Sequence, residues 1–270
     1  MTKEFENMSI DYKNQGNVSI NVDSGVSYIE FSHPQSNSLP SAILKRLAKA
    51  IDDESRNMDS QIIHLTSSGD RVFCGGASFD ELASISNEKQ AMEFFSGFAN
   101  VINSMRKSSK LIVGRIQGKA VGGGVGISAA VDYCFATQYA GLKLSELAVG
   151  IGPFVVGPAV ERKIGVSGLS ELAIDATQFR TAEWGALKGI YSHVYPTIEA
   201  MDEGISELLK TLTSQSVNAQ RALKKALWAG CEGWDDLLLD RARISGKLVL
   251  TDESKTAIKL ILDKKSQEAR

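Results

Sequence analysis

The chain has 270 residues, 43% of them hydrophobic, with 30 Lys and Arg against 32 Asp and Glu. This length and composition are sufficient for one large domain, or for a domain with a small appendage. The nearly balanced charge gives no reason to expect a nucleic-acid partner. No apolar run reaches the length that spans a membrane, and the polar N-terminal sequence lacks a signal-peptide core.

The cysteines and histidines favour neither a disulfide framework nor a metal centre. Cys74, Cys134 and Cys231 are widely spaced and form no Cys-x-x-Cys motif, and the three histidines are also scattered. An odd number of separated cysteines is typical of a reducing compartment. We therefore expect a cytoplasmic protein without a bound metal.

Strand and helix patterns alternate along the first two thirds of the chain, and the last third is helical. Short alternating or β-branched runs predict strands at residues 18–22, 26–31, 61–66, 111–116 and 133–137. Helical spacing predicts helices after Pro40, at 88–106, from Val125, and at 160–164, 168–176, 182–188, 203–212, 217–229, 234–248 and 252–265. The strand–strand–helix order recurs, which predicts an α/β fold.

A glycine-rich segment follows the strand at 111–116. The triplet Gly122-Gly123-Gly124 leads directly into the helix that starts near Val125. Such a turn exposes backbone N–H groups at a helix N-terminus, where an anion or a developing oxyanion binds well. The alternative is a tight turn that only allows close packing of helix and strand. The spacing matches neither the dinucleotide fingerprint nor the P-loop.

A single carboxylate, Glu146, lies in the apolar run after the next strand. Burial would raise its pKa toward neutrality, where a general acid or base works. Alternatively, Glu146 is a surface residue at the end of a strand.

These features, with an earlier glycine motif, resemble the crotonase superfamily, also called the enoyl-CoA hydratase/isomerase family. The three matching parts are Val72-Phe73-Cys74-Gly75-Gly76-Ala77-Ser78-Phe79, the strand–glycine–helix segment, and Glu146. The resemblance extends over residues 15 to 266. It implies a spiral of ββα units with an acyl-CoA site at 1–200, and a helical C-terminal region at 201–270 that forms a homotrimer or a dimer of trimers.

The resemblance also implies an enzyme of fatty acid metabolism that acts on an acyl-CoA thioester. Coenzyme A would be part of the substrate, with no permanently bound cofactor. The backbone N–H groups of Gly75 and Gly123 would form an oxyanion hole for the thioester oxygen as negative charge develops on it. Glu146 would act as general acid and base. Phe94 or Phe98, on the helix at 88–106, could contact the acyl tail or simply belong to the core.

Three further residues are candidates for binding the coenzyme A thioester. Ala77 and Gly122 belong to the two glycine motifs, and a lysine near the C-terminus, Lys264 or Lys265, could contact coenzyme A. A solvated helix end stabilised by the macrodipole explains those lysines equally well.

One position departs from the hydratases of the family, which hold a water between two glutamates. The first of these glutamates corresponds to Gly126 here, whereas the second corresponds to Glu146. One carboxylate suffices to move a proton between C2 and C4, so the residues favour isomerisation over hydration. Asp80 or Glu81 could replace the missing acid, or be ordinary charges in a first helical turn. A non-catalytic acyl-CoA-binding or assembly subunit, decarboxylation and thioester hydrolysis remain alternatives.

Overall fold

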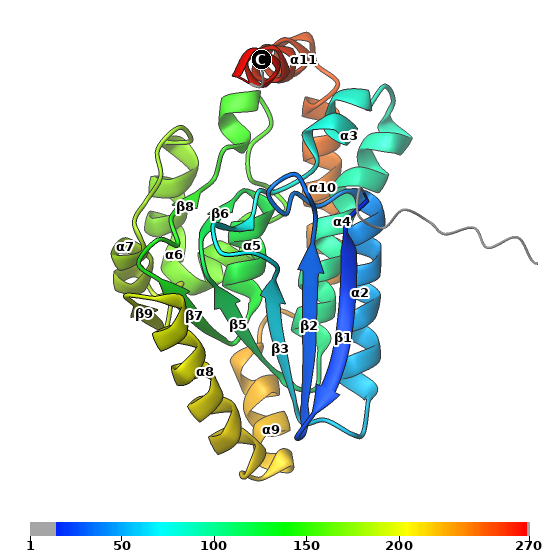
Figure 1. Cartoon of the computed structure of the whole chain (residues 1–270). Helices are drawn as coiled ribbons and strands as arrows, with labels where there is room; N and C mark the ends of the chain where they lie inside the picture. The colour runs from blue at the N-terminus through cyan, green and yellow to red at the C-terminus, as the bar shows by residue number, and fades with distance from the viewer. Residues whose placement is uncertain (1–14, 269–270) are drawn as a thin grey trace, which may run out of the picture.

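The computed structural model describes residues 15–268, which form two sheets surrounded by helices (Figure 1). The large sheet has the order β1 (Asn17–Asp23), β2 (Val26–Ser32), β3 (Ile62–Ser67), β5 (Leu111–Ile116), β7 (Tyr133–Thr137) and β9 (His193–Tyr195). The small sheet has the order β4 (Val72–Cys74), β6 (Lys119–Val121) and β8 (Leu142–Lys143). Neighbouring strands are parallel except in the β1–β2 hairpin.

From β3 onward, consecutive strands alternate between the two sheets, and a helix follows each pair of strands. The first unit is the hairpin with α2 (Ser41–Arg56). The next three units are β3–β4 with α3 (Phe79–Ser84) and α4 (Glu88–Lys107), β5–β6 with α5 (Gly123–Ala130), and β7–β8 with the 3₁₀ helix η1 (Glu146–Val149) and α6 (Gly157–Ile174). The spiral of ββα units is confirmed, and it places the ends of the small-sheet strands next to one another.

Local sequence signals account for several turns and helix ends. The hairpin turn has two residues with positive φ, Ser24 at 49° and Gly25 at 79°, as a type I′ turn requires. Thr181 accepts a hydrogen bond from the Trp184 N–H at 3.2 Å and thereby caps α7 (Ala182–Lys188). The two helices expected at 160–164 and 168–176 form the single element α6, which is kinked at Gly165.

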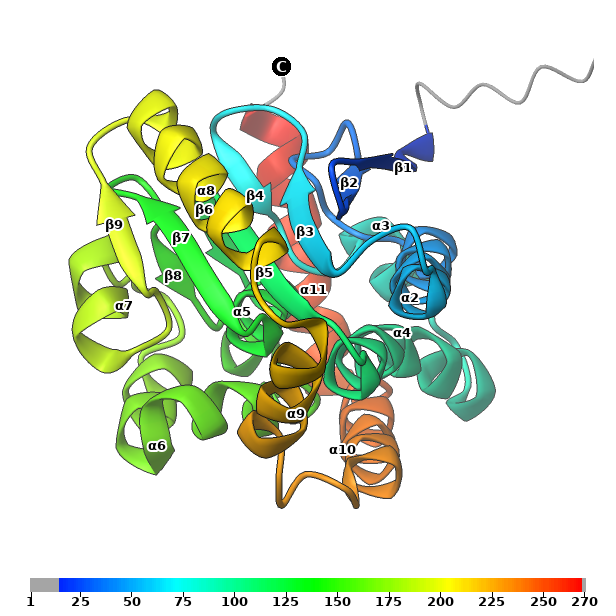
Figure 2. The same ribbon diagram turned by 90° about the horizontal axis from the view of Figure 1, so that it is seen from below.

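The two faces of the large sheet are covered by different helices (Figure 2). α8 (Ile198–Thr213) packs Met201, Ile205 and Leu209 against residues of β2, β3, β5 and β7. The other face packs on α2, α4 and α5 to form the main hydrophobic core. Side chains alternate between these faces along each strand, as the period of two requires.

The C-terminal helices are α9 (Val217–Leu227), α10 (Trp234–Leu248) and α11 (Asp252–Glu268). α10 runs antiparallel to α4, because the Asn103 Nδ2 contacts the Trp234 carbonyl at 3.5 Å and Gly246 lies against Ala91 at the other end. α11 lies over η1, where the Ser254 hydroxyl donates to the Gly150 carbonyl at 3.0 Å. The region expected to serve oligomerisation thus packs closely on the rest of its own chain. Within residues 15–268, no helix is long and apolar enough to cross a membrane.

α9 is attached to the core by a buried ion pair that the sequence analysis did not predict. The Lys224 ammonium lies 2.7 Å from the Asp132 carboxylate, and the two side chains are 2% and 4% exposed. The indole N–H of Trp228 and the backbone N–H of Ile112 also donate to this carboxylate, each at 2.8 Å. These hydrogen bonds offset part of the cost of burying both charges.

Candidate active site

The glycine triplet forms the start of α5. Gly122 has a φ of 52° and a ψ of −114°, and its N–H donates to the Lys143 carbonyl at 2.8 Å. Gly123 is the first residue of the helix, and among the described residues no group accepts a hydrogen bond from its N–H. The first N–H groups of a helix have no partner within the helix. The Gly123 N–H is therefore available to a ligand.

Glu146 lies next to this turn, at the start of η1. A Cβ added at Gly122 would lie 2.9 Å from the Glu146 Oε1, so only glycine allows the carboxylate this close. The residue as a whole is half-buried, but its Oε2 is enclosed and has no hydrogen-bond partner in the described part of the chain. Burial raises the pKa of Glu146 to about 7, although its own backbone N–H acts in the opposite direction. The carboxyl group can thus both accept and release a proton near neutral pH.

The first glycine motif places a different N–H group in the site from the one expected. The Gly75 N–H donates to the Ser36 carbonyl at 3.0 Å, so the assignment of Gly75 as an oxyanion donor is corrected. Gly76, with a φ of 89°, brings the chain so close to α5 that an added Cβ would lie 3.8 Å from the Gly123 nitrogen. The N–H of the next residue, Ala77, has no acceptor among residues 15–268. Ala77 and Gly123 therefore offer two free N–H groups on neighbouring segments.

A narrow cavity of about 80 Å³ lies between these segments. Its walls combine both glycine motifs with Glu146 and with apolar side chains of α3, α4 and the segment after η1. The residues that line it are Gly75, Gly76, Ala77, Phe79, Leu82, Phe94, Phe95, Phe98, Val121, Gly122, Gly123, Ser145, Glu146, Val149, Ile151, Gly152, Pro153, Phe154, Val155, Val156 and Ser245. Phe94 and Phe98 thus border the cavity, as one reading of the sequence expected.

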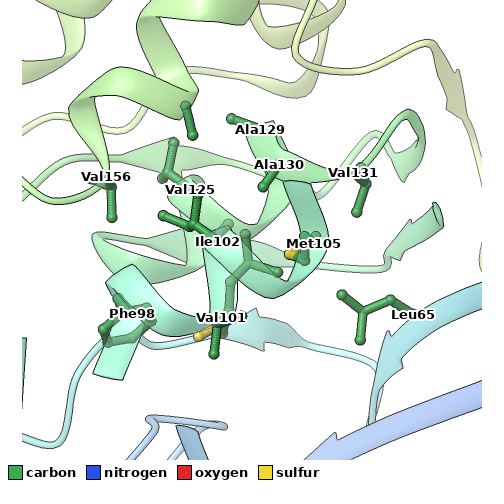
Figure 3. Packing of buried hydrophobic residues seen from close by; sticks show 14 of the residues in the cluster. Leu65, Phe98, Val101, Ile102, Met105, Val125, Ala129, Ala130, Val131 and Val156 are labelled. Atoms are coloured by element: carbon green, nitrogen blue, oxygen red, sulfur yellow. The ribbon is translucent and has the colours of Figure 1, made fainter. Parts of the chain in front are cut away.

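The space next to Gly126 is filled by apolar side chains. A Cβ added at Gly126 would lie 2.5 Å from the Val156 Cγ1 and 3.5 Å from the Ile102 Cδ1. Figure 3 shows Val156, Ile102 and Phe98 grouped around this part of α5. A glutamate at position 126 would have to displace Val156. Among the described residues, no second acid lies on this side of the cavity, and Val156 fills the space that one would need.

The other candidate polar residues lie away from the cavity. Asp80 accepts a hydrogen bond from the Gln35 amide at 2.9 Å, and Glu81 accepts one from the Ser41 N–H at 2.7 Å. Neither carboxylate lines the cavity, so neither occupies the position of the missing acid. Lys264 is exposed on α11 and does not line it, and the side chain of Lys265 lies outside the described residues.

Two lining residues, Val156 and Ser245, carried no signal in the sequence. Val156 belongs to the turn before α6, and Ser245 comes from α10, about 100 residues after Glu146 in the chain. Their positions depend on how helices that are far apart in the sequence pack together, and a local sequence motif cannot predict this packing. Among the described residues, the structure brings together no group of three or more His, Cys, Asp and Glu side chains that could hold a metal ion.

Two glycine turns, whose N–H groups at Ala77 and Gly123 have no acceptor among residues 15–268, lie next to an enclosed carboxylate in a ββα spiral. The sequence profile described as enoyl-CoA hydratase/isomerase matches residues 21–257. The chain belongs to this family, within the crotonase superfamily.

Several known proteins are similar to the chain over most of its length. The peroxisomal Delta(3,5)-Delta(2,4)-dienoyl-CoA isomerase of Arabidopsis thaliana is 25% identical over 232 residues, which cover 80% of this chain and 82% of the relative. The human mitochondrial methylglutaconyl-CoA hydratase is 30% identical over 203 residues, 73% of this chain and 58% of that protein. The crystal structure of an enoyl-CoA hydratase from Bacillus halodurans superposes with a TM-score of 0.84 at 22% identity, covering 90% of this chain and 99% of that one.

Proposed function

We propose that the chain is an isomerase that shifts the double bond of an enoyl-CoA from C3–C4 to C2–C3, with Glu146 as its single acid and base. The observation that carries this proposal is the asymmetry of the cavity. One side holds an enclosed carboxyl group with a pKa of about 7, and the side of Gly126 is filled by Val156.

In the proposed reaction, the Glu146 carboxylate removes a proton from C2 of a 3-enoyl-CoA. The electrons move into the thioester, so negative charge develops on its oxygen. The same carboxyl group then returns the proton to C4, which leaves the double bond between C2 and C3. A pKa near neutrality suits both halves of this transfer, because the group must accept and then donate the same proton.

The thioester oxygen would be held by the N–H groups of Ala77 and Gly123. Neither N–H group has an acceptor within residues 15–268, and both residues border the cavity, whereas the N–H of Gly75 donates to the Ser36 carbonyl. Donors fixed in place before reaction stabilise charge that appears only in the transition state, and one of them contributes about 2.7–4 kcal/mol.

Hydration is the second candidate, because the relatives include a hydratase as well as an isomerase. Hydration needs a water positioned toward C3, and positioning is a large part of catalysis. The apolar contact between Val156 and α5 offers no second anchor for such a water. An acyl-CoA-binding subunit without activity would use the same cavity, but it would not need an enclosed carboxylate, which is costly to bury.

The test compares two reactions on acyl chains of equal length. We expect the purified protein to convert a 3-enoyl-CoA into its conjugated 2-enoyl isomer, seen as a gain in ultraviolet absorbance, faster than it removes that absorbance by hydration. Glu146→Gln should abolish the conversion and keep the affinity for a saturated acyl-CoA within a few-fold. Efficient hydration with little isomerisation would overturn the proposal, and so would full activity of Glu146→Gln.

A further inference from the structure

Ser245 is the one lining residue supplied by the C-terminal helices, and its hydroxyl has no hydrogen-bond partner among the described residues. The residue is 1% exposed, and it lines the cavity. Other helical hydroxyls in the chain donate to the carbonyl four residues earlier: Ser96 to Met92 at 2.6 Å and Ser128 to Gly124 at 2.9 Å. Ser245 makes no such bond, which leaves its hydroxyl free for whatever occupies the cavity.

The register of α10 on α4 places Ser245 at the far end of the cavity from the proposed reacting atoms. Phe98 of α4 lies directly against Gly123, because a Cβ added there would lie 2.1 Å from the Phe98 Cε1. Gly246 lies against Ala91, seven residues earlier on α4. Ser245 is therefore level with Met92, about 9 Å along the helix axis from Phe98. With the thioester at Gly123 and Glu146, as in the proposed reaction, a group that contacts Ser245 would lie several carbons away from the reacting atoms.

The charges around the cavity restrict the kind of group. No Lys, Arg or His lines the cavity, and Glu146 is the only carboxylate among the described residues that does. A second carboxylate on the substrate would be buried without a cation and would be repelled by Glu146. A neutral oxygen needs no counter-charge and pairs well with a free hydroxyl.

We propose that the acyl chain of the substrate carries a neutral oxygen, a hydroxyl or a carbonyl, in its distal part, and that Ser245 binds it. This inference rests on the proposed function, because it assumes that the thioester lies at Gly123 and Glu146. It makes Ser245 a specificity-determining residue rather than a catalytic one.

Binding of unreactive ligands tests the inference apart from the reaction. Two saturated acyl-CoA thioesters of equal length, one plain and one with a distal hydroxyl, would be titrated by calorimetry, together with keto analogues and analogues with the oxygen at neighbouring carbons. The wild type should bind the best oxygenated chain about 3- to 10-fold more tightly than the plain one, the range expected for one neutral hydrogen bond. Ser245→Ala should lose this preference and bind the plain chain as well as the wild type does.

Ser96→Ala is the matched control, because it also removes a helical hydroxyl of the α4–α10 region, but one already bonded to Met92. It should keep the preference. The inference is overturned if the wild type binds the plain chain at least as tightly as every oxygenated one, or if Ser245→Ala retains the preference. A preference in binding without turnover of any enoyl-CoA would refute the isomerase proposal alone, whereas turnover of plain chains without any preference would refute the role of Ser245 alone.

Discussion

Glu146 occupies a position that is unfavourable for an ordinary carboxylate. Its Oε2 has no hydrogen-bond partner in the part of the chain that the structure describes, and its Oε1 lies against the turn at Gly122. Burying a charged group without a partner costs free energy. The neutral form of Glu146 is therefore favoured, which raises its pKa. The same property makes the group useful as a base, so catalysis and stability oppose each other at this residue.

We predict that Glu146→Gln stabilises the protein at pH 8 and not at pH 4.5. The pKa of this carboxyl stands at about 7 in the folded chain, against an ordinary value of 4.5. The folded state therefore binds the proton more tightly than the unfolded state, and its stability falls as the pH rises from about 4.5 to about 7. Glutamine stays neutral throughout, so the variant should be more stable by about 3 kcal/mol at pH 8.

Urea unfolding of both proteins at pH 4.5, 6 and 8 measures this difference. Glu81→Gln is the control, because its carboxylate lies outside the cavity and accepts a hydrogen bond from the start of α2. Parallel curves for the wild type and Glu146→Gln over this range would contradict the assignment of a raised pKa to Glu146.

At the scale of elements, α9 is attached to the chain by one buried charge pair. Asp132 lies in the turn between α5 and β7, and Lys224 reaches it from the last turns of α9. The Arg162 guanidinium stacks on the Trp228 ring at 3.9 Å and connects the same helix to α6. The helix thus depends on polar contacts more than on a wide apolar face.

We predict that Lys224→Met destabilises the protein by about 3–5 kcal/mol, because it leaves the Asp132 carboxylate buried without its cation. The double variant Asp132→Asn/Lys224→Met removes both charges and should lose less than the two single variants lose together. Free energies of unfolding in urea give the three values. Lys225→Met, at the exposed neighbouring position, should change stability by less than about 0.5 kcal/mol. Additive losses would show that the two charges do not act as a pair.

For the molecule as a whole, the long elements could be predicted from the sequence and the short strands could not. β3, β5 and β7 are long enough to show a pattern, whereas β4, β6 and β8 have only two or three residues. These short strands hold the two glycine motifs side by side. Because the strands are too short to show a periodic pattern, the relative position of the motifs could not be predicted from the sequence. The motifs still indicated Gly122, Gly123 and Glu146, which the structure brings together around one cavity.

The features that the sequence motifs do not reveal share a physical cause. The N–H of Gly75 is occupied by the carbonyl of Ser36, which belongs to a loop almost forty residues earlier. Val156 and the hydroxyl of Ser245 reach the cavity because of the way the helices pack. Each depends on contacts between distant segments, which a local motif does not contain.

We predict that the chain forms a homotrimer or a dimer of trimers through its C-terminal helices. Leu223 and Leu227 lie one turn apart on α9 and remain 51% and 43% exposed in the single chain. Apolar side chains in such a row are typical of a surface that another subunit covers.

Sedimentation at micromolar concentration should give a trimer or a hexamer for the wild type and a smaller species for Leu223→Glu/Leu227→Glu. Met58→Glu, at a position 82% exposed in the turn after α2, is the control and should leave the assembly intact. A monomeric wild type would rule out the proposed assembly.

The antiparallel pairing of α10 with α4 also sets the order in which the protein can mature during synthesis. The contact between Asn103 and Trp234 joins residues 131 positions apart, so it cannot form until nearly the whole chain has been made. Until then, the side of α4 that α10 covers stays open to water, and apolar surface of this kind promotes aggregation. A nascent chain that already carries both glycine motifs and Glu146 therefore still lacks the helix that supplies Ser245 to its cavity, and it presents the uncovered side of α4 to chaperones and proteases.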